Sequence, residues 1–201
     1  MKMSKKRKKR FGSVLMILGL ILFFAASSLT AYNIWDEKRA DDVVTQVLKE
    51  LDALDELDSI EAEETLDSET NMPMRTIDNG TFIGFLKIPT LGLRLPVMQE
   101  WDYPNLRISP CRYSGSVYTN DMVVAAHNYS SHFGTLDRLQ SGDDIWFIDM
   151  NGNRFHYTVT QTESIMPTQI EHMITGDWDL TLFTCNYSGR VRVTVRCDLK
   201  S

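Results

Sequence analysis

An uncharged segment of 25 residues, Phe11–Trp35, limits most strongly what this chain can fold into. About 20 apolar residues of helix span the hydrocarbon core of a bilayer, and the centre of the segment, Val14–Ala26, is almost entirely apolar. Seven Lys or Arg residues precede it within residues 1–10, whereas residues 36–70 hold fourteen Asp or Glu. This charge asymmetry predicts a cytoplasmic basic tail at 1–10, a transmembrane helix at 11–35 and an extracellular remainder.

A cleaved signal peptide is the alternative interpretation of the apolar segment. Signal peptides usually have an apolar core of about 7 to 15 residues, which is shorter than the stretch found here. Ala25-Ala26-Ser27 and Ser28–Ala31 nevertheless supply the small residues that a cleavage site requires. The length favours an uncleaved, single-pass anchor in the cell membrane.

An acidic segment at residues 36–75 follows. Its apolar side chains recur at steps of three and four residues, at Val43, Val44, Val47, Leu48, Leu51, Leu54 and Leu57. That period is typical of an amphipathic helix, whose carboxylate-rich face would stay solvated. Beyond Ile60 the apolar positions become rare, and the sequence predicts a linker. We expect an acidic helical stalk and linker over 36–75, with a lid folded over the next domain as the alternative.

Residues 76–201 have the pattern of a mainly β domain with short helices. Strand-like segments fall at 82–88, 93–98, 122–126, 144–150, 153–163, 180–185 and 190–199. Asn151-Gly152 is a two-residue hairpin signal, and helical periodicity is confined to 134–139 and 168–174. Seven or eight short strands in about 125 residues predict a closed barrel, because closure removes exposed strand edges.

The charge and the metal-binding residue types exclude several classes of function. Residues 71–201 hold thirteen acidic against eleven basic residues, so we expect no nucleic-acid partner, and the N-terminal cations adjoin the apolar segment as in a membrane protein. Three cysteines and four histidines are present, but no pair has CxxC or HxxxH spacing. The sequence therefore predicts neither a metal site nor another cofactor.

The segment Thr181–Cys197 predicts two strands that meet beside a thiol. The first strand ends at Cys185, and Tyr187-Ser188-Gly189 supplies turn residues. Two faces then alternate, with Arg190, Arg192, Thr194 and Arg196 on one and Val191, Val193, Val195 and Cys197 on the other. A chain that folds back at the turn places Cys185 opposite the first arginines, about 5 to 8 Å away. Guanidinium groups beside a thiol favour the thiolate and bind anions.

His127 is the candidate for proton transfer. It closes the short apolar strand 122–126, and an imidazole at the mouth of a barrel exchanges protons near neutral pH. His132, five residues later, is the competing candidate and is expected in the loop. His156 and His172 are interpreted as hydrogen-bonded surface residues.

The ordered set of these motifs resembles the sortase family of membrane-anchored bacterial cysteine transpeptidases. The matching segments are VVAAHN at 123–128, HFGTLDRLQSGD at 132–143, TLFTC at 181–185 and RVTVRC at 192–197. Together they cover about residues 80 to 199. The resemblance implies a sortase-like barrel of eight strands, in agreement with the strand pattern.

The resemblance implies a catalytic set of Cys185, His127 and Arg192. Cys185 is the expected nucleophile, His127 the proton donor and acceptor, and Arg192 the group that holds the substrate carbonyl or an oxyanion. Arg190 and Arg196 share the predicted face of Arg192 and stay open as alternatives. The short interval from Cys185 to Arg192 differs from the longer connection of some sortase classes, so the class stays open as well.

Three further residues are expected close to the catalytic set, as substrate-binding or supporting groups. They are Thr184, immediately before the cysteine, Asn128, immediately after the histidine, and Arg190.

The expected reaction is cleavage of an LPxTG-like sorting signal in a surface protein or pilin through a thioester on Cys185. Transfer to an amine of a cell-wall precursor or to a pilin lysine would follow. Release by water, as in a thiol peptidase, is the alternative within the same chemistry. A non-catalytic, membrane-tethered β-barrel binding module with a structural cysteine is the alternative from another class.

The two remaining cysteines are expected to stay unpaired. The alternation places Cys197 towards the barrel core, opposite to the arginines. Cys111 follows Pro110 in sequence that resembles a loop, where it would be a second reactive thiol if exposed. Nothing in the spacing requires the short distance between Cα atoms that a disulfide demands.

Overall fold

The computed structural model describes residues 5–58 and 72–200, with side chains described over 12–52 and 72–200. The linker predicted beyond Ile60 falls largely outside these residues. The chain divides into two units, Met1–Arg39 and Ala40–Ser201, and helix α1 (Lys5–Asp58) contributes to both.

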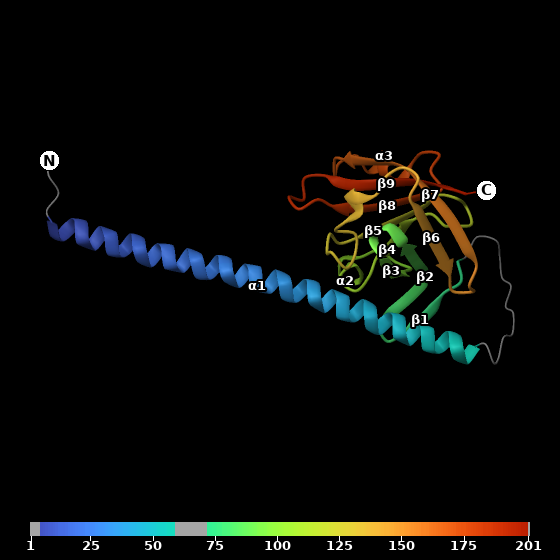
Figure 1. Ribbon diagram of the computed structural model, residues 1–201, viewed down its shortest axis with the longest axis horizontal. Coiled ribbons are helices and arrows are strands. Elements are labelled where there is room, and N and C mark those ends of the chain that lie inside the picture. The colour runs from blue at the N-terminus through green and yellow to red at the C-terminus, as the bar shows by residue number, and fades with distance from the viewer. Residues whose placement is uncertain (1–4, 59–71, 201) are drawn as a thin grey trace. The chain divides into compact units, whose positions relative to one another are not determined.

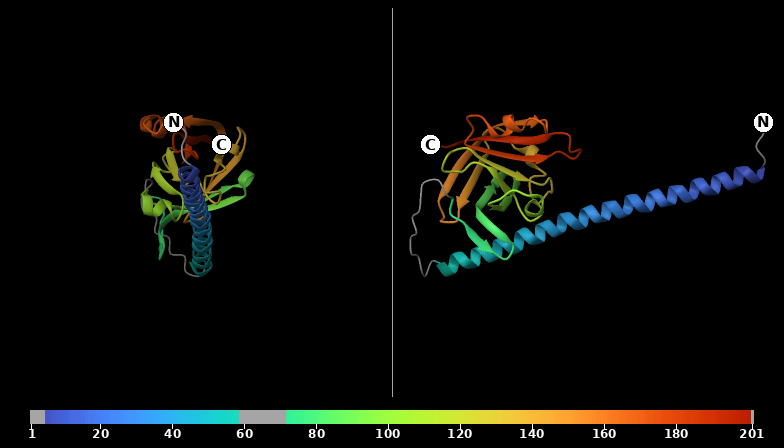
Figure 2. Two further views of the ribbon diagram at one scale, coloured as in Figure 1. Left: turned by 90° about the vertical axis from the view of Figure 1, so that its left-hand side faces the viewer. Right: turned by 180° about the vertical axis from the view of Figure 1, so that it is seen from behind.

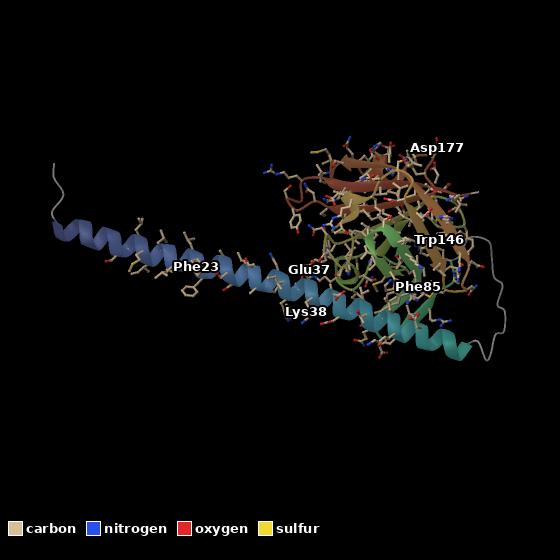
Figure 3. The ribbon with its side chains drawn as sticks, in the orientation of Figure 1. Phe23, Glu37, Lys38, Phe85, Trp146 and Asp177 are labelled. Carbon is tan, nitrogen blue, oxygen red and sulfur yellow. The ribbon has the colours of Figure 1, made fainter. Side chains whose placement is uncertain are left out.

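In the first unit α1 is the predicted apolar helix. Its apolar side chains are exposed along the helix, among them Phe23, which is 66% exposed (Figure 3). By length and composition it is sufficient to cross a membrane, and it is the one such helix in the described part of the chain.

The second unit is built mainly from nine strands. They are β1 (Arg75–Ile77), β2 (Gly80–Ile88), β3 (Leu93–Met98), β4 (Cys111–Ser114), β5 (Met122–Ala126), β6 (Asp144–Asp149), β7 (Arg154–Ile165), β8 (Leu180–Cys185) and β9 (Arg192–Leu199). The connections contain two short α-helices, α2 (Tyr103–Leu106) and α3 (Ile170–Ile174), and two 3-10 turns, η1 (Pro89–Leu91) and η2 (Leu136–Arg138). The predicted hairpin residues Asn151-Gly152 join β6 to β7.

The strands form a sheet that closes on itself (Figures 1 and 2). Hydrogen-bonded neighbours follow the order β1-β2-β3-β4-β5-β8-β9-β7-β6, and β2 also pairs with β6. β1 pairs with the start of β2, at Gly80–Phe82, whereas β6 pairs with its continuation, at Gly84–Lys87. Strands β2 to β9 therefore make a closed barrel of eight strands. The predicted mainly β, closed barrel is confirmed.

Alternation along the strands separates two apolar clusters. The cluster inside the barrel includes Leu182 and Val195, which pair across β8 and β9, and Cys197. A second cluster includes Ala125 and Phe183, which pair across β5 and β8. Because successive side chains point to opposite faces of a strand, this outer cluster lies on the outside of the barrel.

The C-terminal part of α1 packs against the barrel. Val47 and Leu51 are 0% and 1% exposed, and they share the outer cluster with Phe85 of β2 (Figure 3). Asp52 accepts two hydrogen bonds from Arg94 of β3, at 2.6 and 3.0 Å. The apolar stripe predicted for the acidic segment is therefore buried against strands of the barrel.

The sequence did not predict strands β1 and β4. The omission of β4 changes the interpretation of Cys111. Cys111 begins β4, pairs with Ala125 of β5 and is 0% exposed, so the interpretation of this sequence as a loop is wrong. Pro110 ends the preceding loop and the chain then continues as strand. The Cys111 thiol donates to the carbonyl of Ser109 at 3.3 Å, and burial raises its pKa to about 12. Cys111 is therefore not a second reactive thiol.

The three cysteines are free, as predicted. Cys197 is buried in the barrel core, and burial raises the pKa of its thiol far above the usual value. Cys185 is the partly exposed member of the three. The thiol at the end of β8 is thus the one open to solvent.

Candidate active site

Two parallel strands bring the candidate histidine and cysteine together. β5 and β8 pair with Ala126 beside Thr184, so the next residues, His127 and Cys185, lie side by side at the two strand ends. Neighbouring strands are about 4.8 Å apart, which brings the imidazole and the thiol to the same rim of the barrel. Thr184 Oγ1 donates to the carbonyl oxygen of Ala126 at 2.8 Å, and this buried hydrogen bond fixes the two ends relative to each other.

The antiparallel neighbour of β8 brings an arginine to the same place. Cys185 pairs directly with Arg192, the first residue of β9. Directly opposed residues of an antiparallel pair point to the same face of the sheet. Phe183 and Thr194, the next pair on that face, continue it along the outside of the barrel. The thiol and the guanidinium therefore leave the sheet on one face, at its rim.

Asn186 organises the turn between these two strands. Its side-chain oxygen accepts hydrogen bonds from the backbone N–H of Arg190 at 3.0 Å and of Val191 at 3.3 Å. Its own N–H donates to the carbonyl of Val191 at 3.0 Å, which closes the turn. Sequence reasoning missed Asn186, although an asparagine directly before Tyr-Ser-Gly is a turn signal, because its amide can bond to the backbone of following residues.

The three candidate arginines occupy three different environments. Arg192 is half-buried opposite Cys185, and its Nη1 approaches the carbonyl of Gly189 at 3.5 Å. Arg190 is exposed in the turn, because β9 begins only at Arg192. The predicted strand, 190–199, therefore starts two residues too early. Arg196 is 1% exposed and forms an ion pair with Glu163 at 2.8 Å. Of the three, Arg192 is the one that pairs with the cysteine.

The loop after His127 is held by backbone hydrogen bonds. The His127 carbonyl accepts from the N–H of Phe133 at 3.1 Å, and the Tyr129 carbonyl accepts from the N–H of Gly134 at 2.8 Å. A Cβ at Gly134 would lie 2.5 Å from the carbonyl oxygen of Asn128, so this close packing requires glycine. The His127 ring lies against Tyr129, with centroids 4.9 Å apart. Backbone and ring contacts together fix the position of the imidazole.

His132, the competing histidine, lies behind this layer. It is 0% exposed, and its ring centroid is 5.5 Å from that of Tyr129. Burial lowers the pKa of His132 to about 4, and the nearby His127 adds to the effect. A buried, neutral imidazole is poorly suited to exchange protons with a substrate at the rim.

Acid is expected to destabilise the domain through His132. Its pKa is 6.5 in the unfolded chain and about 4 in the folded one, so below pH 6.5 the unfolded state binds a proton that the folded state does not. The contribution is fully present above pH 6.5 and is lost between pH 6.5 and 4, by about 3 kcal/mol in total. Urea unfolding at pH 7 and pH 4 measures this loss.

The matched comparison replaces one histidine at a time. In His132→Leu the difference in unfolding free energy between the two pH values should shrink by about 3 kcal/mol. In His172→Gln, where the histidine is exposed and forms a solvent-screened pair with Glu163, the same difference should change by less than about 1 kcal/mol. An unchanged pH dependence in His132→Leu would contradict the assignment.

A pocket adjoins the thiol at the barrel rim. It is lined by residues of the stretch between His127 and η2, and by residues of β8, of β9 and of the turn between them: Asn128, Phe133, Gly134, Asp137, Thr184, Cys185, Asn186, Tyr187 and Val193. Two of the expected supporting residues, Asn128 and Thr184, thus border the same space as Cys185. Among the described residues, no group of three His, Cys, Asp or Glu could hold a metal ion.

Comparison with known proteins finds sortases that are similar to this chain. The family model of the sortase domain matches residues 86–200. Sortase A of Listeria monocytogenes is 24% identical over 202 residues, which cover 89% of this chain and 84% of that protein.

Solved structures show the same fold. Sortase C from Clostridium perfringens SM101 superposes with a TM-score of 0.53 at 23% identity, covering 80% of this chain and 91% of that one. The complex of Streptococcus agalactiae sortase C1 and MTSET superposes with a TM-score of 0.55 at 22% identity, covering 63% of this chain and 70% of that one.

Proposed function

The chain belongs to the sortase family, and we propose that it is a membrane-anchored cysteine transpeptidase that cleaves an LPxTG-like sorting signal and transfers the acyl part to an amine. The observation that carries the proposal is the pairing of Cys185 with Arg192 beside the strand end at His127. A thiol, an imidazole and a guanidinium at one rim are the groups that acyl transfer through a thioester requires.

In the first half-reaction the Cys185 thiolate attacks a backbone carbonyl of the sorting signal. A bond forms between Sγ and the carbonyl carbon, and the electron pair of the carbonyl moves to its oxygen. Arg192 stabilises this negative charge by charge-assisted hydrogen bonds. His127 donates a proton to the leaving nitrogen as the C–N bond breaks, which leaves a thioester.

In the second half-reaction an amine attacks the thioester carbon. His127, now neutral, takes a proton from the amine, the C–S bond breaks and the Cys185 thiolate is restored. The acceptor is an amine of a cell-wall precursor or a pilin lysine. Water in place of the amine gives hydrolysis, which the same residues would catalyse.

Thr184, Asn128 and Arg190 take supporting roles in this proposal. The hydrogen bond from Thr184 to Ala126 holds the cysteine strand against the histidine strand. Asn128 borders the pocket next to the thiol, and we propose that its amide contacts the substrate there. Arg190 is exposed in the turn and adds positive charge near the site.

The apolar segment 11–35 of α1 and the seven cations that precede it in residues 1–10 support a location in the cell membrane. We propose a single-pass anchor with the N-terminus in the cytoplasm and the barrel outside, because positive residues stay on the cytoplasmic side of such helices. In that position the site meets surface proteins during their export.

Intact mass spectrometry tests the proposal. Incubation with a panel of sorting-signal peptides should produce a protein adduct equal to the acyl fragment, and an added amine should discharge it as a new amide. A small methanethiosulfonate reagent should modify Cys185 rapidly and leave Cys111 and Cys197 unmodified, because both are buried. A Cys185 thiol that reacts no faster than the buried thiols and forms no acyl adduct with any peptide would support the binding module instead.

A further inference from the structure

The pocket beside Cys185 lies at the mouth of the barrel and not on its outer face. Thr184 and Val193 pair across β8 and β9, and both line the pocket. Val193 packs against the apolar cluster inside the barrel, to which the pocket residue Phe133 also belongs. Cys185 and Arg192 form the next pair, so by alternation they point to the outer face. The pocket therefore reaches the thiol from the side of the sheet opposite to Arg192.

The charges on the two sides of the thiol have opposite signs. Of the described residues that line the pocket, Asp137 of η2 is the one carboxylate, and none is basic. Asp137 is exposed, and none of the hydrogen bonds or ion pairs within the described residues involves its carboxylate. Arg192, in contrast, lies on the outer face opposite Cys185, and Arg190 is exposed in the turn. A cation near the thiol is therefore attracted towards the pocket and repelled from the outer face.

The rest of the lining suits an aliphatic chain. Phe133, Gly134 and Val193 are apolar, and Tyr187 adds an exposed aromatic ring. The side-chain oxygen of Asn186 is used within the β8–β9 turn, where it accepts from two backbone N–H groups. An unbranched alkyl chain that ends in an ammonium group matches this combination. Its methylene groups contact apolar surface, and its charged end pairs with a carboxylate.

The proposed acyl transfer requires a second approach to the thiol. After the first half-reaction the acyl chain is bonded to Cys185, and Arg192 is positioned for the carbonyl oxygen. The amine must reach the carbonyl carbon while both stay in place, so it needs a path that neither occupies. The pocket borders Cys185 on the side opposite to Arg192 and supplies such a path.

We propose that the pocket receives the acceptor as a lysine-like alkylammonium group, and that Asp137 is the specificity-determining residue that binds this charge. The inference rests on the transpeptidase function proposed above. The ammonium donates a hydrogen bond to the carboxylate and then releases one proton to water. The neutral nitrogen attacks the thioester carbon, His127 takes a further proton from it, and the C–S bond breaks. Asp137 thus selects the amine and raises its local concentration, and it takes no part in forming the thioester.

Asp137→Asn in the full chain tests the inference with two acceptors. Nα-acetyl-lysinamide is cationic at pH 7, whereas hydroxylamine is neutral. The KM for the lysine derivative should rise about fivefold, as expected for the loss of a solvent-exposed ion pair, and the KM for hydroxylamine should stay within about 1.5-fold of the wild type. Asp137→Lys reverses the charge and should raise the first KM by about tenfold or more. Asp78→Asn, at an exposed position of the β1–β2 turn outside the pocket, is the matched control.

The first half-reaction provides the readout that a general loss of structure would change. The rate of thioester formation without any acceptor, followed by intact mass, should equal the wild-type rate in both Asp137 variants. Added salt should weaken the preference of the wild type for the lysine derivative and leave Asp137→Asn unaffected, because salt screens exposed charges.

An unchanged KM for the lysine derivative in folded Asp137→Asn overturns the inference, and so does an equal rise for hydroxylamine. A wild-type thioester that hydroxylamine discharges and the lysine derivative does not would overturn it as well. If Asp137→Lys does not fold, Asp137→Asn carries the same measurements. A wild-type protein that forms no thioester with any sorting-signal peptide contradicts the proposed function instead.

Discussion

Cys185→Ala is expected to reduce peptide cleavage to background, and His127→Ala and Arg192→Ala should each lower turnover by about a thousandfold or more. The reason is that residues which act as one catalytic unit lose most of the rate when any member is removed. The barrel should remain folded in all three, because each side chain lies partly exposed at the rim. Initial rates with a sorting-signal peptide, together with circular dichroism, measure both effects.

Arg190→Ala is the matched control, since it removes an arginine two residues from Arg192 that lies in the turn. Its rate should stay within about tenfold of the wild type, as expected for an exposed charge that loses little stabilisation. Wild-type activity in Arg192→Ala, combined with a large loss in Arg190→Ala, would transfer the role to the turn. Arg196→Ala is not a suitable control, because it leaves Glu163 without its buried partner.

The placement of the candidate site residues on the strands was largely predictable because it follows local rules. Strict alternation after the turn assigns Arg192 to the face of Cys185 and Cys197 to the core, and the register confirms both placements. The end of an apolar strand at His127 is equally visible in the sequence. A period of two residues fixes which face a side chain occupies, and this rule does not depend on distant parts of the chain.

What covers each face was not predictable. Arg196 and Glu163 are 33 residues apart, and Arg94 and Asp52 are 42 apart, so no local pattern connects them. Alternation along the strand places Arg196 on the same face as Arg192. It could not show that the five-residue helix α3 covers Arg196 and leaves Arg192 partly exposed. Cys111 illustrates the same limit, because a short strand after a proline differs from a loop only through its partners in the sheet.

Removal of the helix before the barrel is expected to destabilise the catalytic domain strongly. A shortened chain of residues 36–201 retains the α1 residues Val44, Val47 and Leu51, whereas a chain of residues 76–201 exposes the barrel surface that they cover. Burial of three such side chains contributes up to about 5 kcal/mol. We expect the thermal midpoint of 76–201 to be lower by about 10 °C or more, or the shorter chain to aggregate. Thermal unfolding followed by circular dichroism makes the comparison.

Point substitutions distinguish the stability lost with side-chain packing from any effect of shortening the chain. Leu51→Ala in residues 36–201 should cost about 2 to 5 kcal/mol, because it leaves a cavity at a side chain that is 1% exposed. Gln46→Ala, on the exposed side of the same helix, should cost less than about 0.5 kcal/mol. Asp52→Asn should also cost little, since its ion pair with Arg94 is solvent-exposed. Equal midpoints for 36–201 and 76–201 would mean that the helix does not pack on the barrel, and Leu51→Ala should then be as neutral as Gln46→Ala.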